Sequence, residues 1–471
     1  MDMMKYKKVL AITTALGVFS PPVQAPACTT AATRNLAHVG PIIVKSYDWD
    51  NTDGYVAVNQ VHLQKTAIGV PDPLTWVSTY QSVTFNQWGM NMPLGGMNEK
   101  GLVVEIMKVG DFMVDRSAKE DYPIASKQGK RKAINQIQWV QYILDTAGSL
   151  NAATKLAKGV YASPDFRIGG KDYYKTLFDI DPVHYLVCND RGTCRTFEYR
   201  NHKLLISRDH AWTDAMPKKQ YPGGQVPFDS DKVSTSTPVN IPLVPVLANN
   251  YLETDAQCLD KYLSLPKGEP CVGGEGKSPE QQACRTACGK ITDPIKDSAK
   301  STRRYIMATG KAEAAPNMKH AATAASYGFN VMGKAACNSS TRWQIVYLPK
   351  LGHAYWKAIK PNQNPDKCEG LSPKTKHGYV NLKTEKKIAH DCRQLKQPRV
   401  WDLDGTLTGE AYKLIEYPSL RYPTLTKINS QALVNNFAHA ARYKDAGLAA
   451  ILGQGNGLSF VEMTYYSCKL F

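Results

Sequence analysis

The chain has 471 residues, of which 43% are hydrophobic and 21% are charged. These proportions are typical of a globular protein with a substantial core and exclude an intrinsically disordered one. The formal net charge is +17, but the basic residues are scattered, and Lys127–Lys132 (KQGKRK) is their densest short run. We interpret this run as a solvated face, and the alternative is a basic surface that attracts anionic envelope components or anionic substrates. Nothing in the sequence indicates a nucleic-acid-binding module.

The first 27 residues are typical of an export signal. Basic residues precede a short apolar segment, Val9–Phe19, which is too short to span a bilayer. Ala25 and Ala27 then form an A-x-A cleavage site directly before Cys28. We therefore expect residues 1–27 to be a signal peptide and the mature protein to be periplasmic or secreted. No later stretch has the length of apolar sequence that a membrane span needs, so we expect no transmembrane segment.

Cleavage after Ala27 makes Cys28 the first residue of the mature protein. A terminal cysteine carries a thiol beside a free α-amine, whose pKa of about 7.7–8.0 lets it take the thiol proton near neutral pH. Two other uses of Cys28 remain open from the local sequence. It could be a lipid anchor, although a lipobox prefers a large aliphatic residue where Ala25 stands, or it could form a structural disulfide. A lipid anchor would make the protein a non-catalytic envelope lipoprotein or binding protein.

The chain contains eleven cysteines. An odd number leaves one thiol over in an oxidising compartment, and Cys28 is the natural one. Cys188 and Cys194 flank a predicted hairpin turn, so we expect a disulfide between them. Cys284 and Cys288 have a C-x3-C spacing, but no second pair with zinc-site spacing accompanies them. We therefore predict disulfides and no metal site.

Strands are predicted first along the mature chain. Apolar residues there cluster or alternate with the pattern of buried and half-buried strands. The expected strands are Ile42–Trp49, Tyr55–Val61, Ser82–Phe85 and Leu102–Met107. The last of these leaves a hairpin turn whose tip is Asn98–Gly101.

Helices and strands alternate in the rest of the chain. Helical periodicity marks Ile134–Ala147 and Leu150–Ala157, the second with Asn151 as its cap. Further strands are expected at His184–Val187, Arg195–Tyr199, Leu204–Ser207, Trp343–Val346 and Ala354–Lys357, and further helices at Arg303–Ala315, Ala321–Gly333 and Leu433–Leu452. This order predicts an α+β fold in which sheets pack in layers with helices outside them.

We expect one large domain, residues 28–452, followed by a C-terminal tail, 453–471. Two cysteine-containing stretches, about 258–300 and 360–396, are interpreted as disulfide-stapled excursions from this domain. Asp402–Leu407 matches the D-x-D-G-T motif of haloacid-dehalogenase-like phosphatases, but too little chain follows to complete their α/β domain. We interpret it as a turn.

Several motifs, in order along the chain, resemble the choloylglycine hydrolase family of N-terminal nucleophile (Ntn) hydrolases. That family includes bile salt hydrolases and penicillin V acylases. The matching segments are Cys28–Thr30, Tyr47–Trp49, Gly96–Leu102 (GMNEKGL), Val246–Asn250 and Arg303–Ile306. The resemblance implies a four-layer αββα sandwich and an enzyme that needs no cofactor and no metal.

The resemblance also implies a role for each matching residue. Cys28 would be the nucleophile and its α-amine the general base, oriented by Asp48. The side chain of Asn249 and a backbone N–H near Lys108 would stabilise the oxyanion. Arg304 would favour the thiolate, because a nearby cation lowers the pKa of a thiol.

Two positions depart from the family pattern. Lys45 stands where the family has arginine, which keeps the charge but loses the planar guanidinium fork. Thiol activation is therefore expected to be weaker or differently arranged, and loss of catalysis remains open. Lys108 stands at a usually uncharged position, so its side chain either selects an anionic substrate group or points to solvent.

The implied reaction is hydrolysis of a linear, non-peptide amide through a thioester on Cys28. The implied partner is a small-molecule amide, and the candidates are conjugated bile acids, phenoxyacyl penicillins and N-acyl homoserine lactones. The sequence is compatible with a homo-oligomer but does not define one.

Overall fold

A computed structural model gives the fold of this protein. It describes residues 28–48, 55–59, 61–62, 64–67, 69–86, 93–109, 121–165, 167–168, 171–172, 182–212, 244–252, 255, 257–258, 261, 265, 271, 274–288, 301–336, 341–359, 378–384, 400–402, 415–416 and 423–424. The predicted signal peptide, the predicted helix Leu433–Leu452, the tail and most of the 360–396 stretch lie outside these residues.

The smaller sheet contains the strand that directly follows Cys28. Its six strands are, in spatial order, β16 (Val246–Leu247), β1 (Thr29–Ala32), β2 (Ile43–Asp48), β17 (Thr341–Leu348), β18 (His353–Ala358) and β19 (Gly378–Asn381). All neighbours pair antiparallel, and Thr30 on β1 lies between Lys45 on β2 and Leu247 on β16. The predicted strand after residue 41 and the late hairpin are thus confirmed.

The larger sheet has eight strands. Their spatial order is β15 (Lys203–Ile206), β14 (Cys194–Arg200), β13 (Val183–Cys188), β8 (Val103–Lys108), β7 (Pro93–Asn98), β6 (Ser82–Asn86), β3 (Tyr55–Asn59) and β20 (Val400–Asp402). The β7–β8 hairpin predicted from GMNEKGL is confirmed. Asp402 ends β20, which pairs antiparallel with β3, whereas the phosphatase motif requires a parallel strand.

Asn98 explains why the GMNEKGL turn is so specific. Its side-chain oxygen accepts hydrogen bonds from the backbone N–H groups of Lys100 and Leu102, both at 3.1 Å. Its side-chain nitrogen donates to the carbonyls of Leu144 and Ala147 at the end of a helix. One amide therefore closes the turn and binds helix carbonyls that would otherwise lack a partner.

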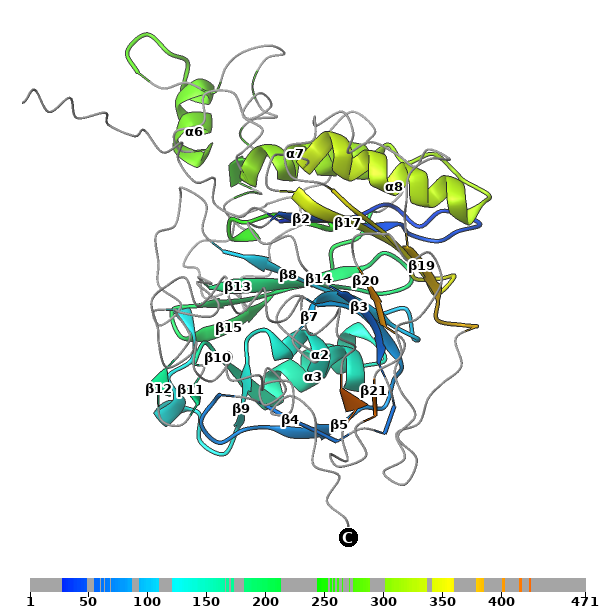
Figure 1. Cartoon of the computed structure of the whole chain (residues 1–471). Coiled ribbons are helices and arrows are strands. Elements are labelled where there is room, and N and C mark those ends of the chain that lie inside the picture. The colour runs from blue at the N-terminus through cyan, green and yellow to red at the C-terminus, as the bar shows by residue number, and fades with distance from the viewer. Residues whose placement is uncertain are drawn as a thin grey trace, which may run out of the picture.

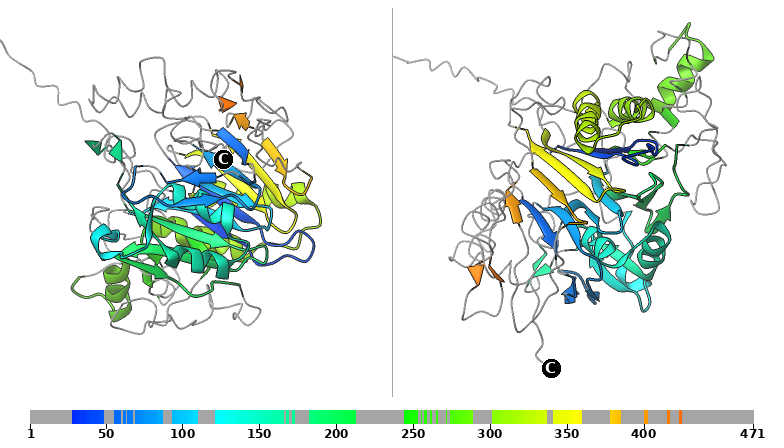
Figure 2. Two further views of the ribbon diagram at one scale, coloured as in Figure 1. Left: turned by 90° about the horizontal axis from the view of Figure 1, so that it is seen from below. Right: turned by 90° about the vertical axis from the view of Figure 1, so that its right-hand side faces the viewer.

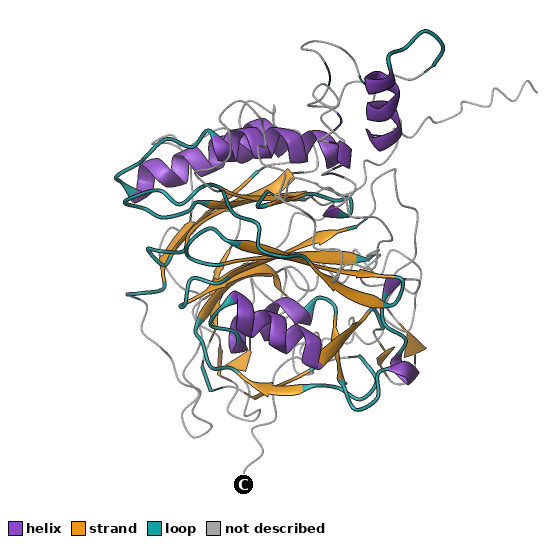
Figure 3. Ribbon diagram, turned by 180° about the vertical axis from the view of Figure 1, so that it is seen from behind, coloured by secondary structure: helices purple, strands orange, loops and turns teal. Residues whose placement is uncertain are grey.

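Helices cover the outer face of each sheet (Figures 1 and 3). The helices α7 (Ser301–Glu313) and α8 (Ala321–Ala336) pack on β1, β2 and β17 of the smaller sheet. On the larger sheet, α2 (Gln138–Thr146) packs on β7 and β8, and α3 (Leu150–Gly159) packs beside α2. Figure 2 shows the two sheets between these helix pairs. The α+β class is therefore confirmed.

Aromatic side chains fill the space between the sheets. Phe85 on β6 meets the ring edges of Tyr347 on β17 and Trp356 on β18, with ring centroids 5.9 and 5.7 Å apart. Phe85 and Trp356 are fully buried. Burial of such rings supplies much of the stability of a two-sheet core.

Two details of the first helical region differ from the prediction. Residues Lys132–Asn135 form strand β9, which pairs in parallel with β10 (Val160–Ser163), so the helix begins only at Gln138. The Asn135 side chain accepts from the N–H of Ile137 and directs the turn between strand and helix. The cap of α3 is Ser149, whose hydroxyl accepts from the N–H of Ala152 at 3.2 Å, and not Asn151.

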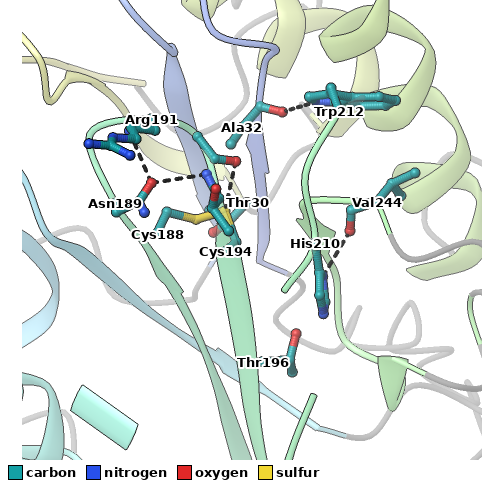
Figure 4. The surroundings of a disulfide bond; sticks show 12 residues. Thr30, Ala32, Cys188, Asn189, Arg191, Cys194, Thr196, His210, Trp212 and Val244 are labelled. Atoms are coloured by element: carbon teal, nitrogen blue, oxygen red, sulfur yellow. Dashed lines mark hydrogen bonds between the residues drawn. A yellow bond between two sulfur atoms is a disulfide. The ribbon is translucent and has the colours of Figure 1, made fainter. Parts of the chain in front are cut away.

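The predicted disulfide between Cys188 and Cys194 is present in the β13–β14 hairpin (Figure 4). Asn189 shapes the turn by accepting from the N–H groups of Arg191 and Thr193. In the predicted excursion, disulfides join Cys258 to Cys288 and Cys271 to Cys284. The two cysteines of the C-x3-C pair, on helix α6 (Pro279–Cys288), thus bond to different partners. Among the described cysteines, only Cys28 is free.

Short elements complete the described chain. They are β4 (Gln64–Thr66), β5 (Thr75–Val77), the 3-10 turn η1 (Ala125–Lys127), β11 (Arg167–Ile168), β12 (Lys171–Asp172), β21 (Ile415–Glu416) and β22 (Pro423–Thr424). No helix within the described ranges has the length and hydropathy of a membrane span.

Candidate active site

The structure brings the predicted site residues together where the two sheets face each other. Strand pairing and helix packing place them there, although they are far apart in sequence. Cys28 precedes β1, Lys45 and Asp48 lie on β2, Lys108 ends β8, Asn249 follows β16, and Arg304 lies on α7.

Cys28 is almost completely buried, with 5% of its surface exposed. Its thiol lies 4.0 Å from the backbone carbonyl of Asp48. Burial raises the pKa of the thiol, because a low-polarity environment disfavours the thiolate. The positive charges of Lys45 and Arg304 oppose that rise, while the Asp48 carboxylate adds to it. The two cations next to the thiol therefore favour its thiolate form against the effect of burial.

Asp48 is held by its own strand and by the neighbouring strand β17. One carboxylate oxygen accepts from the hydroxyl of Ser46 at 3.0 Å and from the hydroxyl of Thr341 on β17 at 2.7 Å. The residue is fully buried. These two hydroxyls hold the carboxylate in place.

Asn249 connects the two sheets and the helix α7. Its side-chain nitrogen donates to the carbonyl of Lys108 at 2.8 Å, and its side-chain oxygen accepts from Arg304 at 2.8 Å. Arg304 also donates to the hydroxyl of Thr29 at 3.1 Å and is fully buried. An amide nitrogen carries two N–H donors, so one of them is available to a reacting oxygen. Lys108 contacts Asn249 through the Lys108 backbone carbonyl. The side chain of Lys108 is partly buried.

Two residues that the sequence did not indicate support the Asn249 turn. The Ser301 hydroxyl accepts from the backbone N–H groups of Asn249 and Asn250, at 2.8 and 2.9 Å. That hydroxyl donates to Asp255, whose second oxygen accepts from the side chain of Asn250. No sequence signal links these residues, because the turn and the start of α7 are about 50 residues apart.

His184 supports the same turn from the larger sheet. Its Nδ1 lies 3.0 Å from a carboxylate oxygen of Glu198, and its Nε2 lies 2.7 Å from the carbonyl of Ala248, the residue before Asn249. That Glu198 oxygen also accepts from the N–H of Leu252. Both ring nitrogens of His184 thus face oxygen atoms, and the ring connects the Glu198 carboxylate to the Asn249 turn. Sequence reasoning did not find His184, because a lone histidine in a strand carries no spacing signal.

Lys45 is paired with a buried carboxylate. Its ammonium lies 3.1 Å from Glu105 and donates to the carbonyl of Ile106 at 2.5 Å. Glu105 also accepts from the hydroxyl of Tyr347 at 2.5 Å. Burial raises the pKa of Glu105, although Lys45 and Tyr347 oppose the rise. Lysine in the arginine position of the family is thus accompanied by its own counter-ion.

The sequence does carry a signal for Glu105. It is the acidic residue within the otherwise apolar strand Leu102–Met107. A carboxylate in such a strand is rarely buried without a partner, which here is Lys45. The backbone makes room for it at Gly95, where an added Cβ would lie 2.2 Å from a Glu105 carboxylate oxygen.

Sequence comparison identifies a relative of this chain. No family model matches it. A penicillin V acylase of Pectobacterium atrosepticum is 25% identical over 172 residues, which are 35% of this chain and 42% of that protein. The predicted resemblance to the choloylglycine hydrolase family is confirmed. The match to this relative covers less than half the length of either protein.

Two solved enzyme structures also align with this chain. Penicillin V acylase from Agrobacterium tumefaciens aligns with a TM-score of 0.49 and 16% identity, covering 80% of this chain and 91% of that one. Conjugated bile acid hydrolase from Clostridium perfringens aligns with a TM-score of 0.47 and 12% identity, covering 83% of this chain and all of that one.

Proposed function

We propose that this protein is an exported hydrolase of linear, non-peptide amide bonds, with Cys28 as an N-terminal nucleophile. The observation that carries the proposal is the convergence of Cys28, Asp48, Asn249 and Arg304 at one buried point between the sheets. The named penicillin V acylase relative supports the same reaction class. Cleavage of residues 1–27 would be both the export step and the activation step, because it creates the α-amine of Cys28.

The proposed reaction uses only groups of the chain. The α-amine takes the thiol proton, and the thiolate attacks the amide carbon to form a tetrahedral oxyanion. The Asn249 side chain and a backbone N–H near Lys108 stabilise this oxyanion. The amine leaves with a proton from the α-ammonium, which gives a thioester and a neutral α-amine. That amine then takes a proton from water, whose hydroxide hydrolyses the thioester to a carboxylic acid and restores Cys28.

The layered arrangement supports the proposal. We propose that the fold is the four-layer αββα sandwich of the Ntn hydrolases, in which two facing sheets lie between two helical layers. The chain order of the site, with the nucleophile before β1 and the carboxylate at the end of β2, accords with this assignment.

Mass spectrometry of the exported protein tests the proposal. We expect an N-terminal peptide that begins at Cys28 with a free amine. We also expect the wild-type protein to hydrolyse a member of a panel of phenoxymethylpenicillin, glycine- and taurine-conjugated bile acids and N-acyl homoserine lactones. Cys28→Ala should lose this activity and retain the fold. An N-acylated Cys28, or a fully active Cys28→Ala variant, would overturn the proposal, and the first result would favour the lipoprotein alternative.

A further inference from the structure

A cavity of about 740 Å³ lies at the edge of the larger sheet, away from the Cys28 cluster. Three segments form it: the chain around η1, the end of α3 with β10, and the β14–β15 hairpin. None of the predicted site residues lines it. Its volume lies within the range of small-molecule binding sites.

The cavity has an apolar floor. Val160, Tyr199 and Ile206 are buried there, and the partly buried Leu204 extends the apolar surface. The ring of Tyr199 stacks on that of Tyr122, with centroids 4.8 Å apart. Such a floor favours an apolar ligand body, because its burial removes hydrophobic surface from water.

The rim of the cavity is cationic. Lys127, Arg131, Lys158 and Lys203 line it with exposed side chains, and no acidic residue is among the described lining residues. Lys127 and Arg131 belong to the KQGKRK run, the densest basic stretch of the sequence. The fold thus combines this run with two lysines from other elements around one cavity. Such a concentration of positive charge attracts anions.

The cavity is also held in shape by the backbone. His202 in the β14–β15 turn has a φ of +66° and contacts the carbonyl of Tyr122 through Nδ1 at 2.8 Å. The Tyr122 hydroxyl bonds the backbone of Val183 on β13. A non-glycine residue at positive φ is uncommon and requires support from its surroundings. The turn that forms one wall is therefore fixed to the sheet before any ligand binds.

We propose that this cavity binds a small amphipathic carboxylate. Its apolar chain would lie on the apolar floor, and its carboxylate would lie at the cationic rim. A monoanion is favoured over a phosphate dianion because α3 ends beside the cavity at Gly159, and helix C-termini repel negative charge. Phosphate sites instead use helix N-termini and their free N–H groups. The Lys158 side chain, in the last turn of α3, offsets part of that repulsion for one charge.

Titration calorimetry with decanoate on the full mature protein tests the proposal. The variant is Lys158→Gln combined with Lys203→Gln, and the matched control is Lys155→Gln combined with Lys277→Gln, two exposed lysines outside the cavity. We expect binding to weaken about fivefold to tenfold in the cavity variant and to stay within about twofold in the control, because each exposed cation contributes modestly. Decan-1-ol and inorganic phosphate should both bind more weakly than decanoate.

Three results would overturn the proposal. They are unchanged decanoate binding in the cavity variant, equal binding of decan-1-ol, and equal binding of inorganic phosphate. The same titration after alkylation of Cys28 with iodoacetamide separates this cavity from the active site. Binding should survive alkylation, and its loss would place decanoate at Cys28 and also overturn the proposal. None of these readouts requires the protein to hydrolyse an amide.

Discussion

Two buried lysine–carboxylate pairs in this protein have the same chemistry but different surroundings. Lys45 pairs with Glu105 at 3.1 Å beside Cys28, and Lys65 on β4 pairs with Asp145 on α2 at 2.9 Å on the outer side of the larger sheet. All four side chains have about 1% exposure or less. Burial raises the pKa of both carboxyl groups, and the paired lysine opposes the rise in each case.

The difference lies in what else contacts each pair. Asp145 also accepts from Trp76 at 2.8 Å and from Gln141 at 2.8 Å, so this carboxylate is saturated with donors from one helix and one hairpin. Glu105 has Lys45 and Tyr347 as partners, and the Lys45 ammonium acts electrostatically on the Cys28 thiol. We interpret the Lys65 pair as an ion pair that holds the β4–β5 hairpin against α2, and the Lys45 pair as part of the proposed active site.

Removal of each lysine gives the largest expected effect. Lys45→Met and Lys65→Met each leave a buried carboxylate without its cation, so each should lower the free energy of unfolding by about 3–5 kcal/mol. Activity per folded molecule should fall at least about tenfold in Lys45→Met only, because only this lysine favours the thiolate. Urea denaturation and amide hydrolysis, normalised to folded protein, measure the two effects.

The conservative variant Lys45→Arg is the control for this pair. It restores the charge, so its activity should lie within about threefold of wild type if charge is what Lys45 contributes. An equal loss of normalised activity in Lys45→Met and Lys65→Met would contradict the distinction between the two pairs.

Removing a neutral hydrogen-bond donor from each of the same two carboxylates should lower the free energy of unfolding by a smaller amount. Tyr347→Phe and Trp76→Phe each delete one hydrogen bond to a buried charged group, which is worth about 1.5–3 kcal/mol. Both should be destabilised by that amount in urea denaturation. Only Tyr347→Phe should change the rate of amide hydrolysis, because Glu105 then interacts with Lys45 alone. A rate change in Trp76→Phe of equal size would show that the effect is general to the fold.

Each strand that was predicted by its residue range is present in the structure, because the patterns of these strands are local. Sequence reasoning missed β9 because Lys132–Asn135 is defined by parallel pairing with β10, and the last two of these residues fall within the helix predicted over Ile134–Ala147. The pairing Cys188–Cys194 was predictable because the two cysteines are six positions apart in the sequence, on either side of one turn.

The residues of the site divide in the same way. Cys28, Asp48 and Asn249 stand in motifs that can be compared with a family, so their positions were predictable. Ser301 and His184 act through contacts with residues far along the chain, and no short pattern marks such contacts. Their importance depends on packing between the sheets and α7, which periodicity does not reveal.

Replacing Gly95 by alanine would crowd Glu105, and the same replacement at Gly159 is the matched control. A Cβ at Gly95 would lie 2.2–2.4 Å from the Glu105 carboxylate atoms, whereas a Cβ at Gly159 would meet nothing within 4 Å. Gly95→Ala should therefore cost about 1–3 kcal/mol of stability and displace Glu105 from Lys45. Gly159→Ala, at the end of α3, should be neutral or stabilising by up to about 1 kcal/mol. Urea denaturation of both variants measures this, and equal stability of the two would show that Glu105 relaxes without cost.

The thiol itself gives the finest test of the difference between the pairs. Burial raises the pKa of Cys28 and Lys45 opposes that rise, so removing the Lys45 charge should raise the pKa further. Because the thiolate is the reactive form, alkylation at a fixed pH below the pKa should then slow. A pKa shift of about one unit corresponds to about a tenfold slower reaction.

Iodoacetamide labelling of the Cys28 peptide, followed by mass spectrometry across a pH series, measures the midpoint of the thiol titration. The midpoint should move to higher pH in Lys45→Met and stay unchanged in Lys65→Met. A midpoint that moves equally in both variants would mean that Lys45 acts on the thiol through stability and not through charge.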